Sequence, residues 1–406
     1  MPDSSPSFER IDEKSLLRQL LHSTPDHVYF KDREGRFLLI NQSQSNIFGL
    51  DSPEDAVGKS DFDFFSAEHA RQALDDEKHI MATGKPLVGI VEKETWPDGR
   101  ITWASTTKEP LRDARGGIIG TFGISRDVTK RHEAEQKVAA FTEELKQVNK
   151  QTHADISIAG EMQEALLPRI YPLFPNQCLP SESAIRFAHV YQPAGTVGGD
   201  MLCIEKLSES KVGVFICDAI GHGVRAALLS AMVFALFHEL SHRHETPGPF
   251  LRALNDRMRN LMCDCPDVVF ATACYIIIDI ENHVVTCANA GHPSPMLVSP
   301  SHNNSVFLHP DSSQLGPALA LVDQAFYPES RHDYPPGSRI LMVTDGILDA
   351  GPKPGIEFGE ERLAMLMDRQ RDSSPDVLLS ELLNSLKSFT GHGKLQDDLC
   401  AVCMAL

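Results

Sequence analysis

Three stretches of the chain differ in how hydrophobic and polar positions follow one another. Residues from about 15 to 128 carry short alternating apolar runs between turn signals, and residues from about 129 to 167 are almost free of glycine and proline. Residues from about 185 to 406 mix apolar runs with many glycine turns. We therefore predict an N-terminal tail at 1–14, a first domain at 15–128, a helical segment at 129–167 and a C-terminal domain at 168–406.

The first domain has the pattern of an antiparallel sheet interrupted by helices. A turn at 32–35 joins two β-prone runs into a hairpin, and a helical pattern at 66–83 ends at Gly84. The predicted strands are residues 28–30, 37–40, 87–94, 101–107 and 118–124. This order predicts a five-stranded antiparallel sheet with helices between its second and third strands.

The helical segment carries a stripe of positions that step alternately by three and four residues. These positions are Val138, Phe141, Leu145, Val148, Thr152, Asp155, Ala159, Met162 and Leu166. The spacing predicts a parallel dimeric coiled coil, in which the polar Thr152 and Asp155 weaken the seam. The alternative is a single helix that lies on one of the domains.

Composition narrows the class of protein. The chain has 406 residues, 42% of them hydrophobic, and its 38 basic and 56 acidic side chains give a net charge of −18. A field of that sign repels polyphosphate backbones, so we expect no nucleic-acid partner. Residues 1–14 lack the apolar core of a signal peptide, and the longest apolar run, 226–237, is too short to span a bilayer. We expect a cytoplasmic protein that does not enter the membrane.

The cysteines predict neither a disulfide scaffold nor a structural zinc site. Nine cysteines are too few for a disulfide framework in a chain of 406 residues, which favours a reducing compartment. Cys263 and Cys265 form a CxC pair, but two further ligands at zinc spacing do not stand out.

Several aspartates of the C-terminal region stand next to β-prone runs, and all but Asp218 are beside a glycine or a second aspartate. They are Asp200, Asp218, Asp345 and the pair Asp397 and Asp398. One aspartate in such a place is most often a turn former or a helix cap. Several oxygen ligands together instead favour a hard cation, Mg²⁺ or Mn²⁺. A carboxylate cluster that holds two such ions suits hydrolysis of a phosphate ester.

A series of short motifs in the first domain resembles a PAS sensor domain. In order, they are residues 26–32, Gly35, Asn41, Gly58-Lys59, residues 96–99, Trp103 and residues 120–129. The resemblance implies a domain that binds haem, flavin or a small metabolite, or that dimerises, and the residues do not choose among these. His69 and His79 are candidate haem ligands, with a surface histidine as the alternative. Residues 26–129 contain no cysteine, which disfavours a flavin photosensor that traps its chromophore with one.

The C-terminal region resembles the SpoIIE-type branch of the PPM metal-dependent serine/threonine phosphatases. The motifs in order are residues 159–168, 198–200, 218–223 with 226–227, 270–272, 288–293, 315–316, 336–337, 344–346 with 349–350, 358–359 and 397–398. The resemblance implies an α-β-β-α sandwich, so the whole chain is predicted to be a multidomain α+β protein.

The same resemblance implies roles for individual residues. Asp200 and Asp218 would flank two metal ions, with the backbone carbonyl of Ala219 as a further ligand. Asp345 and Asp397 would complete the metal shell, with Asp398 as the alternative to Asp397.

Four other residues near these motifs are weaker candidates. His222 is either a proton donor to the leaving oxygen or a structural histidine after a glycine turn. Arg225 stands where the family usually has proline and would contact a phosphate or cap the edge of the site. Asn289 and His292 are candidates near the phosphate, with a role in core and turn as the alternative.

These resemblances predict a signal-controlled protein phosphatase. Its expected substrate is a phosphorylated STAS-type anti-sigma-factor antagonist, and the expected assembly is a homodimer through the PAS domain and coiled coil. A non-catalytic PAS scaffold with a metal-binding phosphatase-like domain is the alternative. A diguanylate cyclase is disfavoured, because Met201 and Leu202 follow Gly-Gly-Asp where the cyclase motif has Glu-Phe. A histidine kinase is disfavoured too, because no glycine-rich ATP-lid pattern is present.

Overall fold

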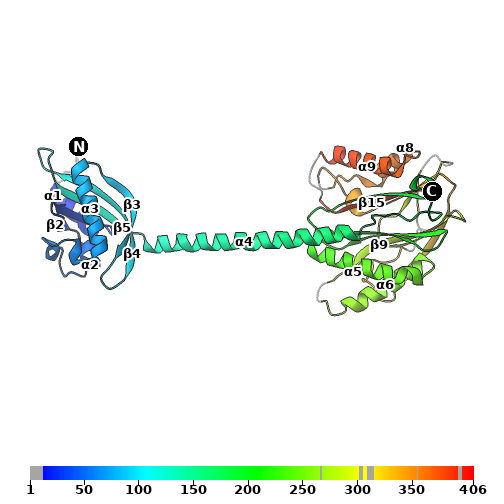
Figure 1. Ribbon diagram of the computed structural model, residues 1–406, viewed down its shortest axis with the longest axis horizontal. Coiled ribbons are helices and arrows are strands. Elements are labelled where there is room, and N and C mark those ends of the chain that lie inside the picture. The colour runs from blue at the N-terminus through cyan, green and yellow to red at the C-terminus, as the bar shows by residue number, and fades with distance from the viewer. Residues whose placement is uncertain (1–11, 266–267, 301–304, 309–314, 354, 392–395) are drawn as a thin grey trace, which may run out of the picture. The chain divides into compact units, whose positions relative to one another are not determined.

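The computed structural model describes residues 12–265, 268–300, 305–308, 315–353, 355–391 and 396–406 (Figure 1). The chain forms two compact units, Met1–Val148 and Asn149–Leu406. Helix α4 (Thr129–Leu166) begins in the first unit and ends in the second.

The first unit is built on one antiparallel sheet with the strand order β2-β1-β5-β4-β3. Its elements are α1 (Glu13–Ser23), β1 (His27–Asp32), β2 (Phe37–Ile40), α2 (Gln42–Phe48), η1 (Pro53–Ala56), η2 (Asp61–Asp63), α3 (Ala67–Thr83), β3 (Leu87–Thr95), β4 (Ile101–Arg112) and β5 (Ile118–Asp127). Ser66 caps the start of α3, and Gly84 ends that helix in the left-handed conformation. The predicted five-stranded sheet is confirmed.

The core of the first unit combines aromatic rings with buried charges. Tyr29 and Phe37 pack edge to face with ring centroids 6.2 Å apart. Lys31 is 2% exposed and contacts the carboxylates of Asp61 and Glu77. Burial alone would lower the pKa of Lys31, but these two carboxylates outweigh it and raise the pKa. The lysine therefore stays charged inside the domain.

Helix α4 buries very little of its surface. Gln163 is its one buried residue. Val138, Phe141, Leu145 and Val148, all on the predicted stripe, expose 66%, 61%, 49% and 57% of their surface. The predicted helix is confirmed, and the coiled coil stays a prediction.

The second unit contains two five-stranded sheets. One has the order β13-β10-β9-β8-β7 and the other the order β12-β11-β14-β15-β6. The first sheet consists of β7 (Asp200–Lys206), β8 (Lys211–Ala219), β9 (Ala271–Asp279), β10 (Val284–Ala290) and β13 (Glu329–Asp333). The second consists of β6 (Arg186–Gln192), β11 (Met296–Val298), β12 (Val306–Phe307), β14 (Arg339–Val343) and β15 (Leu399–Ala405).

Helices cover both outer faces of this pair of sheets (Figure 1). They are α5 (Val224–Leu240) and α6 (Pro247–Met262) on the first sheet, and α8 (Gly359–Arg369) and α9 (Pro375–Thr390) on the second. The short helices are η3 (Pro180–Glu182), η4 (Ser241–Arg243) and α7 (Asp345–Leu348). Three apolar layers separate these elements, and the middle one lies between the sheets, where Ile216 and Ile276 face Met342 and Val402. The α-β-β-α sandwich is confirmed.

Helix α5 is apolar because it is a core helix. By length and composition alone, the stretch Val224–Arg243 is apolar enough to cross a membrane, and it is longer than the apolar run 226–237 within it. Leu229, Val233 and Phe237 are buried against the first sheet. That packing accounts for the composition of the helix.

Candidate metal centre

Two aspartates face each other at the end of the first sheet. β7 and β8 pair antiparallel in a register that sets Asp200 directly opposite Asp218. Asp200 is 1% exposed, and its Oδ2 accepts a hydrogen bond of 2.8 Å from the Thr344 hydroxyl. Its Oδ1 is buried and has no hydrogen-bond partner among the described residues.

Glycine at position 199 allows the backbone to come close to this pair. A Cβ atom there would lie 2.6 Å from the Ala219 carbonyl oxygen and 3.1 Å from Asp218 Oδ1. Any side chain would therefore push β7 away from β8. The Ala219 carbonyl predicted as a ligand thus lies beside the two carboxylates.

The second sheet brings the remaining acids. Asp345 opens α7 directly after β14, and Asp397 and Asp398 precede β15, which pairs with β14. The two oxygens of Asp398 accept hydrogen bonds of 2.8 Å from Ala194 N–H and 2.5 Å from Gly199 N–H. Asp397 is exposed, and its Oδ1 accepts from the backbone N–H of Asp398. The carboxylate of Asp398 therefore fastens the loop before β7, whereas Asp397 is exposed and acts on the pKa values of Asp218 and Asp345.

The carboxylates raise one another's affinity for protons. Burial, followed by repulsion from Asp218, raises the pKa of Asp200 well above its ordinary value, against the hydrogen bond from Thr344. Burial, followed by Asp345 and Asp397, raises the pKa of Asp218 to about 7. Burial, followed by Asp397, also raises the pKa of Asp345. The charged groups that act most strongly on Asp200, Asp218 and Asp345 are other carboxylates.

This arrangement fits divalent cations. Within the described ranges, no three or more His, Cys, Asp or Glu side chains are already drawn tightly enough together to hold an ion. The sheets nevertheless bring the predicted aspartates to one end of the sandwich, and Asp200 Oδ1 lacks a partner there. Oxygen donors with excess negative charge match Mg²⁺ or Mn²⁺.

His222 and Arg225 lie at the exposed edge of this cluster. Both residues are exposed, His222 in the loop after β8 and Arg225 in the first turn of α5. Burial raises the pKa of Asp398, and the nearby His222 acts in the opposite direction. His222 is therefore close to the acids and open to a substrate.

Asn289 and His292 are part of the protein interior. The Asn289 side chain accepts from His292 N–H at 2.8 Å and donates to the His292 carbonyl at 2.7 Å, which closes the turn after β10. His292 is 5% exposed, and its Nδ1 is 2.9 Å from the hydroxyl of Thr272, the residue that pairs with Asp218. Burial lowers the pKa of His292 to about 3. These contacts favour the role in core and turn.

Gln163 is a residue that the sequence interpretation missed. Its side chain is 6% exposed and grips the peptide group of Gly198, two residues before Asp200. It donates to the Gly198 carbonyl at 2.6 Å and to the Ser230 hydroxyl at 3.0 Å, and it accepts from Gly198 N–H at 3.0 Å. The heptad pattern assigns the neighbouring Met162, not Gln163, to the seam of a coiled coil, and Met162 is 67% exposed. In the sequence, Gln163 stands out only as a member of the motif at 159–168.

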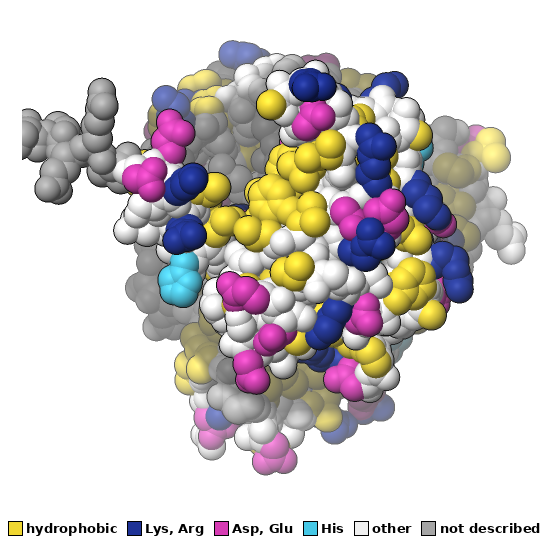
Figure 2. Space-filling model, turned by 90° about the vertical axis from the view of Figure 1, so that its left-hand side faces the viewer, with side chains coloured by type: hydrophobic (Ala, Val, Ile, Leu, Met, Phe, Trp, Pro, Cys, Tyr) yellow, Lys and Arg dark blue, Asp and Glu magenta, His cyan; other side chains and the backbone are white. Residues whose placement is uncertain are grey.

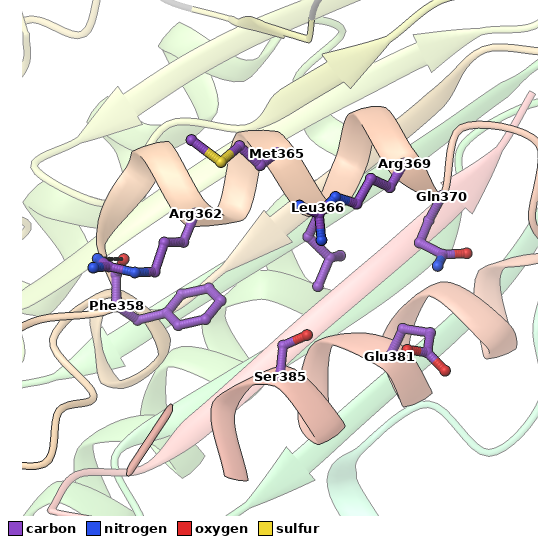
Figure 3. A pocket seen from close by; sticks show the side chains of 8 residues that line it. All are labelled: Phe358, Arg362, Met365, Leu366, Arg369, Gln370, Glu381 and Ser385. Carbon is purple, nitrogen blue, oxygen red and sulfur yellow. Dashed lines mark hydrogen bonds between the residues drawn. The ribbon is translucent and has the colours of Figure 1, made fainter. Parts of the chain in front are cut away.

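A cavity elsewhere in the second unit does not include these residues. It lies between α8 and α9, has a volume of about 240 Å³, and is lined by side chains that include Phe358, Arg362, Met365 and Glu381 (Figure 3). None of its lining residues is a predicted site residue.

The cavity that His69 lines in the first unit is small. A cavity of about 30 Å³ lies among Tyr29, Lys31, Phe48, His69 and Glu94, which is room for about one or two water molecules. Haem and flavin are far larger. His69 lines this cavity but packs against a Phe65 ring 4.7 Å away, and His79 is exposed on α3.

The four-layer fold with its end cluster of carboxylates defines the class as a PP2C-type phosphatase domain. The model described as Stage II sporulation protein E (SpoIIE) matches residues 208–406, and the model described as PAS fold matches residues 21–133. The chain therefore carries a SpoIIE-type PP2C domain at 208–406 and a PAS domain at 21–133.

Relatives share both sequence and fold with the chain. Phosphoserine phosphatase RsbP of Bacillus subtilis is 25% identical over 52% of this chain and 50% of its own length, so the chain matches about half of that relative. Phosphoserine phosphatase RsbU of the same species is 24% identical over 64% of this chain and 72% of its own length. The SiaA-PP2C domain of Pseudomonas aeruginosa shares the fold, with a TM-score of 0.54 and 19% identity over 64% of this chain and 98% of that domain.

Proposed function

We propose that this chain is a signal-controlled, metal-dependent protein phosphatase that hydrolyses phosphoserine or phosphothreonine. The observation that carries the proposal is the cluster of Asp200, Asp218, Asp345 and Asp397, whose members act on one another without a matching cation. The names of RsbP and RsbU as phosphoserine phosphatases support the choice of substrate class.

Each residue of the cluster has a distinct task in this reaction. Asp200 and Asp218, with the Ala219 carbonyl, would hold two Mg²⁺ or Mn²⁺ ions, and Asp345 and Asp397 would complete their coordination. When bound, such ions activate a water and neutralise charge on a phosphoryl group. Thr344 orients Asp200 through its hydrogen bond.

Two further residues act around the metal ligands. Asp398 holds Gly199 N–H and Ala194 N–H, so it positions the loop before β7 rather than binding a metal ion. His222 stands exposed beside the acids and would protonate the leaving serine oxygen.

The substrate and its setting follow from the family resemblance. A phosphorylated STAS-domain protein would be the substrate, and its dephosphorylation would release a sigma factor by partner switching. We place this reaction in the cytoplasm.

Gln163 provides a connection from the linker helix to the site. It is the one buried residue of α4, and it holds the peptide group two residues from Asp200. A rotation or shift of α4 would therefore move the segment that leads to Asp200. Inserting four residues after Val148 rotates the downstream part of the helix, and we expect phosphatase activity to change. Unchanged activity in that variant would contradict a relay through α4.

Dimerisation of the first unit is supported by its exposed apolar side chains. Leu16, Leu17 and Leu20 of α1 expose 49%, 57% and 62% of their surface, and no residue of α1 is buried. Figure 2 shows hydrophobic side chains gathered on one face of the molecule. A second copy would cover these side chains together with the stripe of α4. Sedimentation of the full chain tests this, and a monomer at all concentrations would contradict it.

Phosphate release from a phosphoserine protein tests the central proposal. The assay compares EDTA, Mg²⁺ and Mn²⁺ on the full chain, on Asp218→Asn and on Asp333→Asn, an exposed aspartate at the edge of the same sheet. We expect metal-dependent release that Asp218→Asn abolishes and Asp333→Asn retains. Release that survives Asp218→Asn would contradict the two-metal reaction and favour the non-catalytic scaffold.

A further inference from the structure

The C-terminal end of α5 carries two histidines at metal-ligand spacing. His238 and His242 are four residues apart, in the order His-Glu-Leu-Ser-His. α5 ends at Leu240, and η4 continues the helical turn through Ser241–Arg243. Residues four apart lie on the same side of a helix, so both imidazoles face in one direction.

Glu205 of β7 stands between the two imidazoles. Its Oε2 is 3.3 Å from His238 Nδ1, and its Oε1 is 3.3 Å from His242 Nε2. Ion-paired hydrogen bonds are usually about 2.7–2.9 Å long, so both contacts are long, although the one between His242 and Glu205 is a hydrogen bond. Two ligand atoms at zinc bond lengths of about 2.0–2.1 Å and a tetrahedral angle lie roughly 3.3 Å apart. The observed separations match the edge of a tetrahedral site.

The surroundings hold two of the three side chains in place. The His238 ring packs against Phe234 and Phe237, with ring centroids 4.5 Å and 5.4 Å away. Glu205 projects from a strand and is 27% exposed, whereas the imidazoles of His238 and His242 are 43% and 55% exposed. The site is therefore open to an ion from solvent and has a fixed side against the protein.

Two buried hydroxyl groups add to the polar character of this region. Ser241 Oγ, between the histidines in sequence, and Tyr275 Oη are buried without a hydrogen-bond partner among the described residues. Burial raises the pKa of the Tyr275 hydroxyl, and Glu205 raises it further, which places that carboxylate near the hydroxyl. Water bound to an ion at Glu205 would offer these groups the kind of partner they lack.

The glutamate between the histidines is already engaged. Glu239 Oε1 is 3.2 Å from Arg243 and 3.1 Å from Arg257. It is therefore not available as the general base that this motif supplies in zinc peptidases. The cluster has the ligands for binding a metal ion but lacks the base for peptide hydrolysis.

The geometry points to a zinc site formed by His238, His242 and Glu205, separate from the carboxylate centre. Imidazole nitrogens favour Zn²⁺ over Mg²⁺, whereas the aspartate cluster favours hard cations. Each imidazole contacts Glu205, but in the part of the chain that the structure describes no three His, Cys, Asp or Glu side chains already surround an ion. The ion would replace the two imidazole–carboxylate contacts by changes in side-chain torsion alone.

Such an ion would link β7 and α5, which both begin near the carboxylate centre. β7 starts at Asp200, and α5 starts shortly after His222. Glu205 lies near the far end of β7, and His238 lies in the last turn of α5. Zinc there would fix the helix to the strand and raise the thermal stability of the second unit.

Equilibrium dialysis of the full chain against Zn²⁺, with excess Mg²⁺ to fill the carboxylate centre, tests the site. We expect one zinc ion per chain, with affinity at least about tenfold weaker in His238→Gln and His242→Gln. His153→Gln, an exposed histidine on α4, is the matched control and should bind zinc as the original chain does. Co²⁺ should give the intense visible bands of a tetrahedral site, which both variants lose.

Three outcomes would overturn the zinc site. Zinc binding that is equal in both histidine variants would place the ion elsewhere, and binding lost only in Asp218→Asn would assign it to the carboxylate centre. Binding that is unchanged in Glu205→Ala would reduce the site to a surface histidine pair. None of these results bears on phosphate release, so the proposed phosphatase function is tested independently.

Discussion

The two units bury acidic side chains in opposite ways. In the PAS unit, Lys31 lies between Asp61 and Glu77, and Lys108 lies 3.0 Å from Asp76 and 3.2 Å from Glu92. In the phosphatase unit, the strongest charged neighbours of Asp200, Asp218 and Asp345 are other carboxylates. The PAS core has internal cations, whereas we propose that ions from solution take that place in the aspartate cluster. We therefore call the first charge network complete and the second incomplete.

Removing a cation from the complete network should have the largest effect on stability. Lys31→Met leaves two buried carboxylates without their shared partner, which costs on the order of 3–5 kcal/mol. Trp96 and Trp103 are the two tryptophans of the chain, and both lie in the PAS unit. Urea unfolding followed by tryptophan fluorescence therefore reports on this unit.

Lys78→Met is the control for that experiment, because Lys78 is exposed on α3 next to Glu77. It should change stability by less than about 0.5 kcal/mol. A Lys31→Met protein as stable as this control would show that the PAS network is not held together by its cation.

Glu94 gives the PAS unit a distinct dependence on pH. Burial raises the pKa of Glu94 to about 7, against a hydrogen bond of 2.7 Å from the Thr102 hydroxyl. The pKa of Glu94 is higher in the folded than in the unfolded protein, so the protonated side chain stabilises the fold. This contribution to the free energy of unfolding is fully present below the unfolded pKa and is lost as pH rises through about 7. The original chain should lose roughly 3 kcal/mol of unfolding free energy between acidic and mildly alkaline pH. We expect no such loss in Glu94→Gln.

Fluorescence-detected unfolding between pH 5 and 8 measures this loss. Glu109→Gln, at an exposed position of β4, is the matched control and should keep the pH dependence of the original chain. The same slope in all three proteins would show that Glu94 is ionised in the folded domain at neutral pH.

A substitution at Gln163 tests the aspartate cluster without changing any of its carboxylates. Gln163→Met keeps the volume of the side chain but leaves the buried groups of Gly198 unpaired, which costs about 1–3 kcal/mol. We also expect roughly tenfold weaker metal affinity, because the segment that leads to Asp200 is less fixed. Calorimetry and a metal titration of phosphate release measure the two effects.

Gln147→Met is the control for Gln163, since Gln147 is exposed on the same helix. It should leave both quantities unchanged. A loss of stability in Gln163→Met without any change in metal dependence would make Gln163 a packing residue only.

Removing a carboxylate from the aspartate cluster should have the smallest effect on stability, and it should stabilise the protein rather than destabilise it. In the metal-free protein above pH 7, Asp218→Asn relieves repulsion and should raise stability by about 1 kcal/mol, because the folded pKa of Asp218 is raised to about 7. Saturating Mn²⁺ should reverse the order, because the original chain then gains more binding energy. Scanning calorimetry with and without Mn²⁺ checks both signs, and destabilisation in the metal-free state would contradict the repulsion.

The sequence predicted individual helices and strands better than it predicted how these helices and strands contact one another. The helical pattern at 66–83 with its stop at Gly84 predicted a helix, and α3 runs from Ala67 to Thr83 with Gly84 as its C-cap. The register that sets Asp200 opposite Asp218 depends on how β7 and β8 pair, which spacing along the chain does not specify. Likewise, the sequence left Asp397 and Asp398 as alternative metal ligands, and it did not reveal that Asp398 accepts hydrogen bonds from the backbone of Ala194 and Gly199.

Gln163 shows why the heptad pattern was incomplete. The stripe describes a surface for another helix, whereas Gln163 is buried by hydrogen bonds to a loop and to Ser230. A polar contact of this kind has no hydrophobic periodicity to reveal it.

The narrow attachment of α4 also bears on how such chains are assembled in evolution. Where α4 enters the catalytic unit, Gln163 holds Gly198, and Gly160 passes so close to Thr196 that a Cβ atom would lie 2.5 Å from its carbonyl oxygen. These two residues, three positions apart, contact the segment before β7, and Leu166 of the same helix packs against the core of the second unit. Any upstream domain whose last helix carries a glycine and, three positions later, a glutamine would make the same contacts with Thr196 and Gly198. Sensors could then be exchanged by recombination within the helix, with the catalytic half left untouched.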